Sequence, residues 1–273
     1  MSGDEGSGGV ESGSVGVGDG SAMEAEFDTL AAWTEDAVRE LGPRYAIPAA
    51  CRGSGSPADL RWLADGLGLH GDDRFLDAGA GLGGPAAWLQ VHLGVRWQAR
   101  PLVTDPMPHA VAAARRLFDQ PAFAARSEEL PLTDGSVDAG WALGVLCTTP
   151  EKRALLAELH RVLVPGAPLG LLVLVRTVDE VHNAPEGNTF PSRAELRADL
   201  AATGFTVSAE IDAAALPDAP VEWQEDGERV TEVIRRDHVD HPAWRQADEQ
   251  GAQMGRLIGE QTVVTVLVRA LRD

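Results

Sequence analysis

Glycines recur at every second position, Gly79, Gly81 and Gly83, directly after a short apolar run. Glycine tolerates backbone conformations that other residues avoid, and its lack of a side chain lets a ligand approach the main chain. Pro85 follows, and proline suits the first turn of a helix because its missing N–H is not needed there. The pattern therefore predicts a strand, a glycine turn and a helix N-terminus, an arrangement typical of a nucleotide-type binding site.

Two carboxylates bear on which nucleotide this turn would bind. Gly79-x-Gly81-x-x-Gly84 fits a dinucleotide fingerprint, and Asp105 follows about twenty residues later, where a ribose-binding carboxylate is expected. Asp77, however, precedes the first glycine by two residues and would repel a pyrophosphate. A ligand that carries an ammonium and a sulfonium but no phosphate would be attracted instead. A nicotinamide-dependent oxidoreductase therefore stays a rival interpretation, which Asp77 disfavours.

Strand and helix patterns alternate from residue 73 to the end of the chain. The expected strands are 74–78, 99–104, 122–126, 137–146, 169–175, 205–211 and 262–271. Such alternation predicts an α/β fold with an open, mostly parallel sheet and helices on both faces. Ligands bind such sheets beyond the carboxyl ends of the strands. We therefore expect the glycine turn, Asp105, Glu128 and the loop after Val175 to meet at one edge.

The chain divides into a tail and one domain. Residues 1–22 are rich in Gly, Ser and acidic residues and contain no aromatic side chain, a composition that predicts disorder. Residues 23–273 are expected to form a single domain. Within it, two amphipathic helices within 23–70, joined by a loop over 45–57, precede the first strand, and a charged, partly helical insertion occupies 215–260.

Local signals fix the start of two later helices. Thr149-Pro150-Glu151 supplies an N-cap hydroxyl, a proline and a carboxylate that favours the positive end of a helix. Ser192-x-x-Glu195 is a capping box. We expect helices to begin at both places.

Composition restricts the partners. Acidic residues outnumber basic ones by 42 to 23, for a formal net charge of -19, so the surface should repel nucleic acids and anionic lipids. No apolar run reaches the length of a membrane helix. Cys51 and Cys147 fit no metal or disulfide spacing, and no signal peptide is recognisable. We expect a soluble, cytoplasmic protein that binds neither nucleic acid nor membrane.

Five motifs occur in order along the chain. They are Leu76-Asp77-x-Gly79-x-Gly81-x-Gly83, Val103-Thr104-Asp105, Glu128-Glu129-Leu130-Pro131-Leu132, Asp134-Gly135-Ser136-Val137-Asp138 and Glu158-Leu159-His160-Arg161-Val162-Leu163-Val164-Pro165-Gly166. With this series the chain resembles a class I S-adenosylmethionine-dependent methyltransferase of the small-molecule branch, similar to ubiquinone-biosynthesis and natural-product enzymes. The resemblance covers about residues 60–205, and the strand near 262–271 extends it. It implies a Rossmann-like, seven-stranded sheet whose last strand is antiparallel and lies between the fifth and sixth, with a helical lid between strands six and seven.

The resemblance also implies a set of residues that bind S-adenosyl-L-methionine. Asp77 would lie near the amino group of the cofactor, and Asp105 would accept both ribose hydroxyls. The remaining cofactor-binding residues would be Gly79, Gly81 and Gly83 around the methionine portion and ribose, Pro106 and Met107 against the adenine, Ser127 and Glu128 at the adenine edge, and Leu143 and Gly144 beneath the cofactor.

Two positions depart from the family pattern. Many relatives carry an aspartate that accepts the adenine amino group where this chain has Arg126, and arginine offers only donors. The histidine pair common after the fourth strand is replaced by Cys147-Thr148. These departures motivate an alternative: a degenerate relative that binds the cofactor or a metabolite without turnover.

Methyl transfer needs a base only when the acceptor must lose a proton. His182, after the fifth strand, is the best-placed candidate. His109 and His160 are expected to be structural or exposed, and His238 and His241 to face water. We expect methyl transfer to an oxygen, nitrogen or carbon of a small organic molecule, in a mostly apolar pocket closed by the N-terminal helix, the insertion and the loop that carries Arg52. No metal site is expected.

Overall fold

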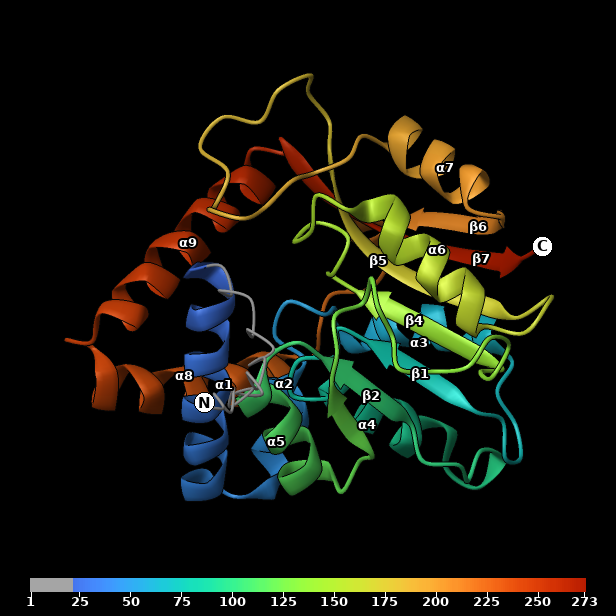
Figure 1. Ribbon diagram of the computed structural model, residues 1–273. Coiled ribbons are helices and arrows are strands. Elements are labelled where there is room, and N and C mark those ends of the chain that lie inside the picture. Colours follow the sequence, from blue (N-terminus) through green and yellow to red (C-terminus); the bar gives the residue numbers. More distant parts are fainter. Residues whose placement is uncertain (1–21) are drawn as a thin grey trace, which may run out of the picture.

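The computed structural model describes residues 22–273, and these form one seven-stranded sheet in the order β3-β2-β1-β4-β5-β7-β6 (Figure 1). The strands are β1 Phe75–Ala78, β2 Leu102–Asp105, β3 Ala122–Ala124, β4 Ala139–Leu143, β5 Pro168–Arg176, β6 Phe205–Asp212 and β7 Val263–Arg272. β7 pairs antiparallel with β5 on one side and β6 on the other, whereas β1 to β5 pair in parallel. The predicted fold class, with its antiparallel last strand, is confirmed.

The helices fall into two groups, one on the sheet and one beyond its carboxyl edge. Their bounds are α1 Ala22–Leu41, α2 Ala46–Ala50, α3 Pro57–Leu67, α4 Gly84–Leu93, α5 Pro108–Phe118, α6 Lys152–Val162, α7 Arg193–Ala202, α8 Val221–His238 and α9 Pro242–Gly259. Leucines of α6 and α7 pack on one face of the sheet, and leucines of α3 and α4 pack on the other. Both faces are therefore covered, as Figure 1 shows.

The middle of the sheet is apolar on both sides. β5 is buried along almost its whole length, as expected for a central strand that carries helices on both faces. Trp141 of β4 is fully buried and packs edge-on against Phe75 of β1. This rigid centre fixes where β1 and β4 end, and the strand order reverses between these two strands, which is where open α/β sheets bind ligands.

α1, α8 and α9 pack on one another beyond the carboxyl edge. Their shared core contains Val38 of α1, Ile234 of α8 and Trp244 of α9. α8 and α9 are the predicted insertion between β6 and β7, and both are helical over most of 215–260. Of the two expected N-terminal helices, α1 belongs to this cap, whereas α3 packs on the sheet.

The loop expected over 45–57 is wrong in part, because residues 46–50 form the short helix α2 after a 3-10 turn at Pro43–Tyr45. Five residues are too few to show helical periodicity. α2 is held by tertiary packing instead: the backbone of Ala50 lies where a Cβ at Gly84 would be, so only glycine fits at the start of α4.

Helix starts agree with the sequence in one case and differ in another. Ser192 and Glu195 form the predicted capping box of α7. The Thr149 prediction is wrong, since α6 begins at Lys152 and the Thr149 hydroxyl donates to Glu128 Oε1 at 2.6 Å. A second capping box, Ser56 with Asp59 at the start of α3, was not anticipated.

The predicted disordered tail lies outside the described residues, apart from Ala22. Among residues 22–273, no helix is both long and apolar enough to cross a membrane.

Candidate functional site

The glycine turn connects β1 to α4 at the carboxyl edge of the sheet. Gly79, Gly81 and Gly83 all have positive φ angles, of 70°, 55° and 79°, which disfavour other residues. The N–H groups of Gly79 and Ala80 both donate to the Thr104 carbonyl at the end of β2, at 2.8 and 2.9 Å. The turn is therefore tied to the neighbouring strand, in one fixed shape.

Only one of these glycines faces open space. A Cβ at Gly79 would collide with the side chain of Val145, and a Cβ at Gly83 would collide with Gln120. No atom lies within 4 Å of a Cβ built on Gly81. Two glycines thus serve close packing within the protein, and Gly81 is the one whose missing side chain leaves room for a ligand.

Asp105, at the end of β2, braces the same turn from the other side. Its Oδ2 accepts the N–H of Gly81 at 2.8 Å, and its Oδ1 accepts the N–H of Met107 at 3.0 Å. Burial raises the pKa of this carboxyl to about 6, although the two backbone donors lower it. Each oxygen retains a second lone pair, so Asp105 can still accept hydroxyl groups.

Asp77 is the most deeply buried carboxylate of the site, at 1% exposed. Its Oδ2 has no hydrogen-bond partner among the described residues, and neither has the nearby buried Trp141 Nε1. Burial raises the pKa of Asp77 to about 7, and the charge of Asp105 raises it further, while the Trp141 indole lowers it without forming a well-aligned hydrogen bond. The Ala86 N–H also lowers this pKa, so one oxygen of Asp77 is left unpaired. A buried carboxylate with an unpaired oxygen is costly, and a cation placed beside it would remove that cost.

The rim after β3 carries the arginine that departs from the family pattern. Arg126 is exposed, and its Nη1 pairs with Glu24 Oε1 of α1 at 2.9 Å. Its Nε lies 3.9 Å from Glu128 Oε2, while Glu128 Oε1 accepts the Thr149 hydroxyl. Ser127 is buried between them. Arg126 thus joins α1 to this rim.

The end of β4 meets the loop after α2. Leu143 is buried, and Gly144 has a φ of 79°. A Cβ at Gly144 would lie 3.0 Å from the Gly53 carbonyl, so the loop closes over the end of this strand. Cys147 is buried and its Sγ contacts the Gly144 carbonyl at 2.9 Å, with its pKa raised to about 11 by burial. Its thiol is therefore no proton acceptor near neutral pH.

The histidines divide into three situations. His182 is exposed in the loop after β5 and makes no hydrogen bond within residues 22–273, so its predicted role as a base stays a prediction. His109 lies at the start of α5 and is held by Asp28 of α1. The Asp28 carboxylate accepts the backbone N–H of His109 and contacts its Nδ1, both at 2.7 Å. His160 packs edge-on against Phe205.

His238 and His241 make contacts within the protein that the sequence did not suggest, although His241 is exposed as expected. His238 stacks on Trp33 of α1, with ring centroids 3.9 Å apart, and His241 meets the same indole edge-on at 5.0 Å. His241 also caps α9, since its Nδ1 accepts the N–H of Ala243. Both histidines hold the cap helices together.

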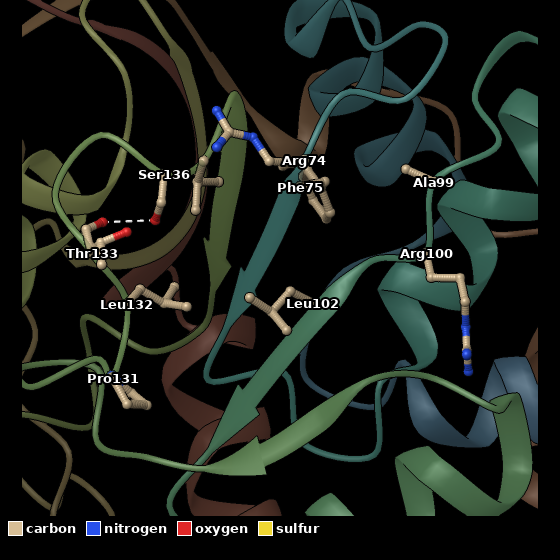
Figure 2. A pocket seen from close by; sticks show the side chains of 10 residues that line it. Arg74, Phe75, Ala99, Arg100, Leu102, Pro131, Leu132, Thr133 and Ser136 are labelled. Carbon is tan, nitrogen blue, oxygen red and sulfur yellow. Dashed lines mark hydrogen bonds between the residues drawn. The ribbon is translucent and has the colours of Figure 1, made fainter.

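A surface hollow of about 400 Å³ lies away from this site. Figure 2 shows it between the starts of β1 and β2 and the loop of Pro131 and Leu132, at the amino ends of these strands. The residues predicted to bind a cofactor follow the carboxyl ends instead. Within residues 22–273, no group of three or more His, Cys, Asp or Glu side chains is arranged to hold a metal ion.

The structure adds residues of α1 that sequence reasoning did not single out. Glu24 reaches Arg126, Asp28 reaches His109, and Glu26 is buried. Their pairings span 81 to 224 residues of chain, so no local pattern signals them.

Comparison with known proteins agrees with this geometry. Residues 76–171 match the family model described as "Methyltransferase domain". That segment contains the glycine turn, Asp105, Glu128 and Gly144. No curated protein sequence matches the chain. The family model over residues 76–171 and the observed sheet order both support the resemblance to class I S-adenosylmethionine-dependent methyltransferases.

Solved structures share the fold at low identity. The [4+2]-cyclase SpnF is 22% identical, with 81% of this chain and 83% of that chain covered and a TM-score of 0.63. Geranyl diphosphate C-methyltransferase from Streptomyces coelicolor is 19% identical over 79% and 76%, with a TM-score of 0.57. The cyclopropane synthase MmaA2 from Mycobacterium tuberculosis is 13% identical over 79% and 83%, with a TM-score of 0.63.

Proposed function

We propose that this protein uses S-adenosyl-L-methionine to methylate an oxygen, nitrogen or carbon atom of a small organic molecule. The observation that carries the proposal is the buried Asp77 carboxylate, whose Oδ2 has no partner at the head of a glycine turn that leaves room only over Gly81. A cofactor with an ammonium group satisfies that carboxylate, and a pyrophosphate would be repelled by it.

The donor set fits the rest of this cofactor. Asp105 has free lone pairs for two ribose hydroxyls, and its neighbours Pro106 and Met107 are half-buried, as suits contact with a flat ring. Glu128 and the buried Ser127 offer polar atoms at the adenine edge. Arg126 is committed to Glu24 and Glu128, so it leaves the adenine amino group to backbone acceptors or to Glu128.

When bound, the cofactor supplies a methyl group on a sulfonium. The task of the protein is to position the acceptor in line with that methyl group and to exclude water. The cap of α1, α8 and α9 stands where an acceptor would be enclosed. Two solved structures with this fold are titled as complexes of geranyl diphosphate C-methyltransferase with a small substrate, which supports a small acceptor here.

A second candidate is a relative that binds the cofactor without methyl transfer. The fold match with a protein titled a [4+2]-cyclase supports this second candidate. Arg126 and the buried Cys147, which stand where the family pattern has other residues, support it too. Both candidates require the same cofactor site and differ in turnover.

The experiment has two parts. Calorimetry with S-adenosyl-L-methionine and S-adenosylhomocysteine measures binding, and Asp105→Ala is expected to abolish it. Incubation with a library of phenols, thiols, amines and carbon acids, read by mass spectrometry, measures a methyl gain. Binding without methyl gain favours the second candidate. Unchanged binding by Asp105→Ala contradicts the assigned site, and binding of NADH in its place supports an oxidoreductase.

A further inference from the structure

The acceptor side of the site is bounded by segments that are far apart in sequence. The loop after α2 covers the end of β4, with the Gly53 carbonyl 3.0 Å from a Cβ built on Gly144. The loop after β5 is tied to the same strand end, because the Thr189 N–H donates to the Cys147 carbonyl at 2.8 Å. Met23 of α1 closes on that loop at Gly187. The first turns of α1 therefore face the carboxyl ends of β4 and β5 (Figure 1).

One acidic side chain of α1 is buried at this place. Glu26 is 4% exposed, and its Oε2 accepts the Gln250 Nε2 of α9 at 3.0 Å. Its second oxygen, Oε1, makes no hydrogen bond with any residue of the described part of the chain. Oε1 is not one of the fully buried atoms that lack a partner, so it is the oxygen of this carboxylate that a small molecule can reach.

The groups around Glu26 come from three segments, the α2–α3 loop, the loop after β5 and α9. Burial is the largest influence on the pKa of Glu26 and raises it. Arg52 of the α2–α3 loop lowers this pKa, and Glu186 of the loop after β5 raises it. Asp248 of α9 lies near Arg52. The pKa of Arg52 is itself lowered by burial, although its side chain remains in contact with solvent. Glu26 and Arg52 therefore lie close together, between α1, α9 and the loops after α2 and β5.

We propose that Glu26 is the proton acceptor of this site, an inference that rests on the proposed function. An oxygen, nitrogen or carbon nucleophile of the acceptor forms a bond to the methyl carbon, and the bond between methyl and sulfur breaks with its electron pair left on sulfur. The proton of the acceptor passes to Glu26 Oε1. Gln250 orients the carboxylate, and Arg52 tunes its charge.

The other titratable groups near the site suit this role less well. His182 is exposed and has no hydrogen-bond partner in the described chain to orient its ring. The Cys147 thiol, with a pKa of about 11, is protonated. Asp77 and Asp105 lie under the glycine turn, on the cofactor side.

The first test needs neither cofactor nor acceptor. The side-chain carboxyl carbons of glutamate are labelled with ¹³C, and each is titrated by NMR, with Glu26→Gln identifying the resonance of Glu26. We expect Glu26 to titrate above the exposed glutamates, and Arg52→Gln to move its midpoint higher still. A Glu26 midpoint equal to that of the exposed glutamates, unmoved by Arg52→Gln, overturns the proposal.

The second test measures rates for the pair phenol and thiophenol, since the thiol ionises without help near pH 8 and the phenol does not. Glu26→Gln is expected to lower kcat for phenol by about 100-fold or more, to leave KM and the thiophenol rate near wild type, and to remove the acidic limb of the pH profile. Asp36→Asn, an exposed change on the same helix, is the control.

The two proposals fail in different ways. Wild-type protein that binds the cofactor and methylates nothing in the library refutes the proposed function, and the role of Glu26 with it. Wild-type turnover that Glu26→Gln leaves unchanged, or that His182→Gln abolishes, refutes the role of Glu26 alone.

Discussion

At the residue scale, Asp77 links ligand binding to pH. Its pKa of about 7 in the folded protein lies above the usual value of 3.8, because burial disfavours the charged form more than the Trp141 indole and the Ala86 N–H favour it. The folded state therefore holds a proton that the unfolded state has released. This group stabilises the ligand-free protein fully below about pH 4, and the stability is lost as pH rises through about 7.

Asp77→Asn tests this directly. At pH 8 the ionised Asp77 carboxylate opposes folding by about 4 kcal/mol. The asparagine amide removes this charge but is itself buried without partners. We therefore expect the unfolding free energy at pH 8 to rise by only about 1–2 kcal/mol. Denaturant melts at pH 5 and pH 8 measure it, with the exposed Asp72→Asn as control. A variant that gains as much at pH 5 as at pH 8 contradicts the linkage.

Binding follows the opposite course. A cation favours the ionised Asp77, so cofactor affinity should rise with pH up to about 7 and then level off, by up to tenfold per pH unit below that value. Asp77→Asn should bind weakly at every pH. Calorimetry across pH 5 to 8 measures this dependence, and a flat wild-type affinity would show that the ligand does not meet Asp77.

Gly81 offers a second residue-scale prediction with a close internal control. Gly81 and Gly135 share φ angles of 55° and 56°, and neither has an atom within 4 Å of a built Cβ. Alanine at either position costs about 1–2 kcal/mol of backbone strain. Gly81→Ala should also abolish cofactor binding, whereas Gly135→Ala, in a turn far along the chain, should retain it. Equal affinities in calorimetry would place the ligand elsewhere.

At the scale of elements, α1 caps the N-terminus of α5, a helix far from it in the sequence. Asp28 accepts the N–H of His109, the second residue of α5, and so satisfies a donor that the helix cannot. Asp28→Ala should lower the unfolding free energy by about 1 kcal/mol. Asp36→Ala, which breaks only an exposed pair with Arg39, should cost far less. Equal losses in denaturant melts would mean that Asp28 acts as an ordinary surface charge.

The elements also show how far the sequence could lead. β1, β5, α7 and the glycine turn follow from signals within about ten residues, and the motif series ordered them into the right sheet. α2 was missed because packing on α4 holds five residues that carry no periodicity. The pairs Glu24–Arg126 and Glu26–Gln250 join distant segments, so only the folded chain reveals them.

At the scale of the whole molecule, other segments cover the two site carboxylates. Asp77 and Asp105 are 1% and 2% exposed, and α1 is fastened to the rim at Arg126 and to α5 at His109. We therefore expect the cofactor to enter beneath the first turns of α1. These two fastenings are polar and partly exposed, so each contributes little. The apolar packing of α1 on α8 and α9 begins only at Leu30, so the first turns of the helix can release.

Hydrogen exchange tests this opening. Bound S-adenosylhomocysteine should slow exchange in the first half of α1, in the glycine turn and at residues 181–190, and leave the amino-end hollow of Figure 2 unchanged. Arg126→Ala should speed exchange in α1 and raise both association and dissociation rates, because release of the helix limits both. Arg236→Ala, which frees Glu40 at the other end of α1, is the matched control and should leave the cofactor rates unchanged. Equal effects of the two variants would show that α1 opens as a whole together with α8 and α9. Exchange in α1 that does not change on binding would show that the cofactor enters by another route.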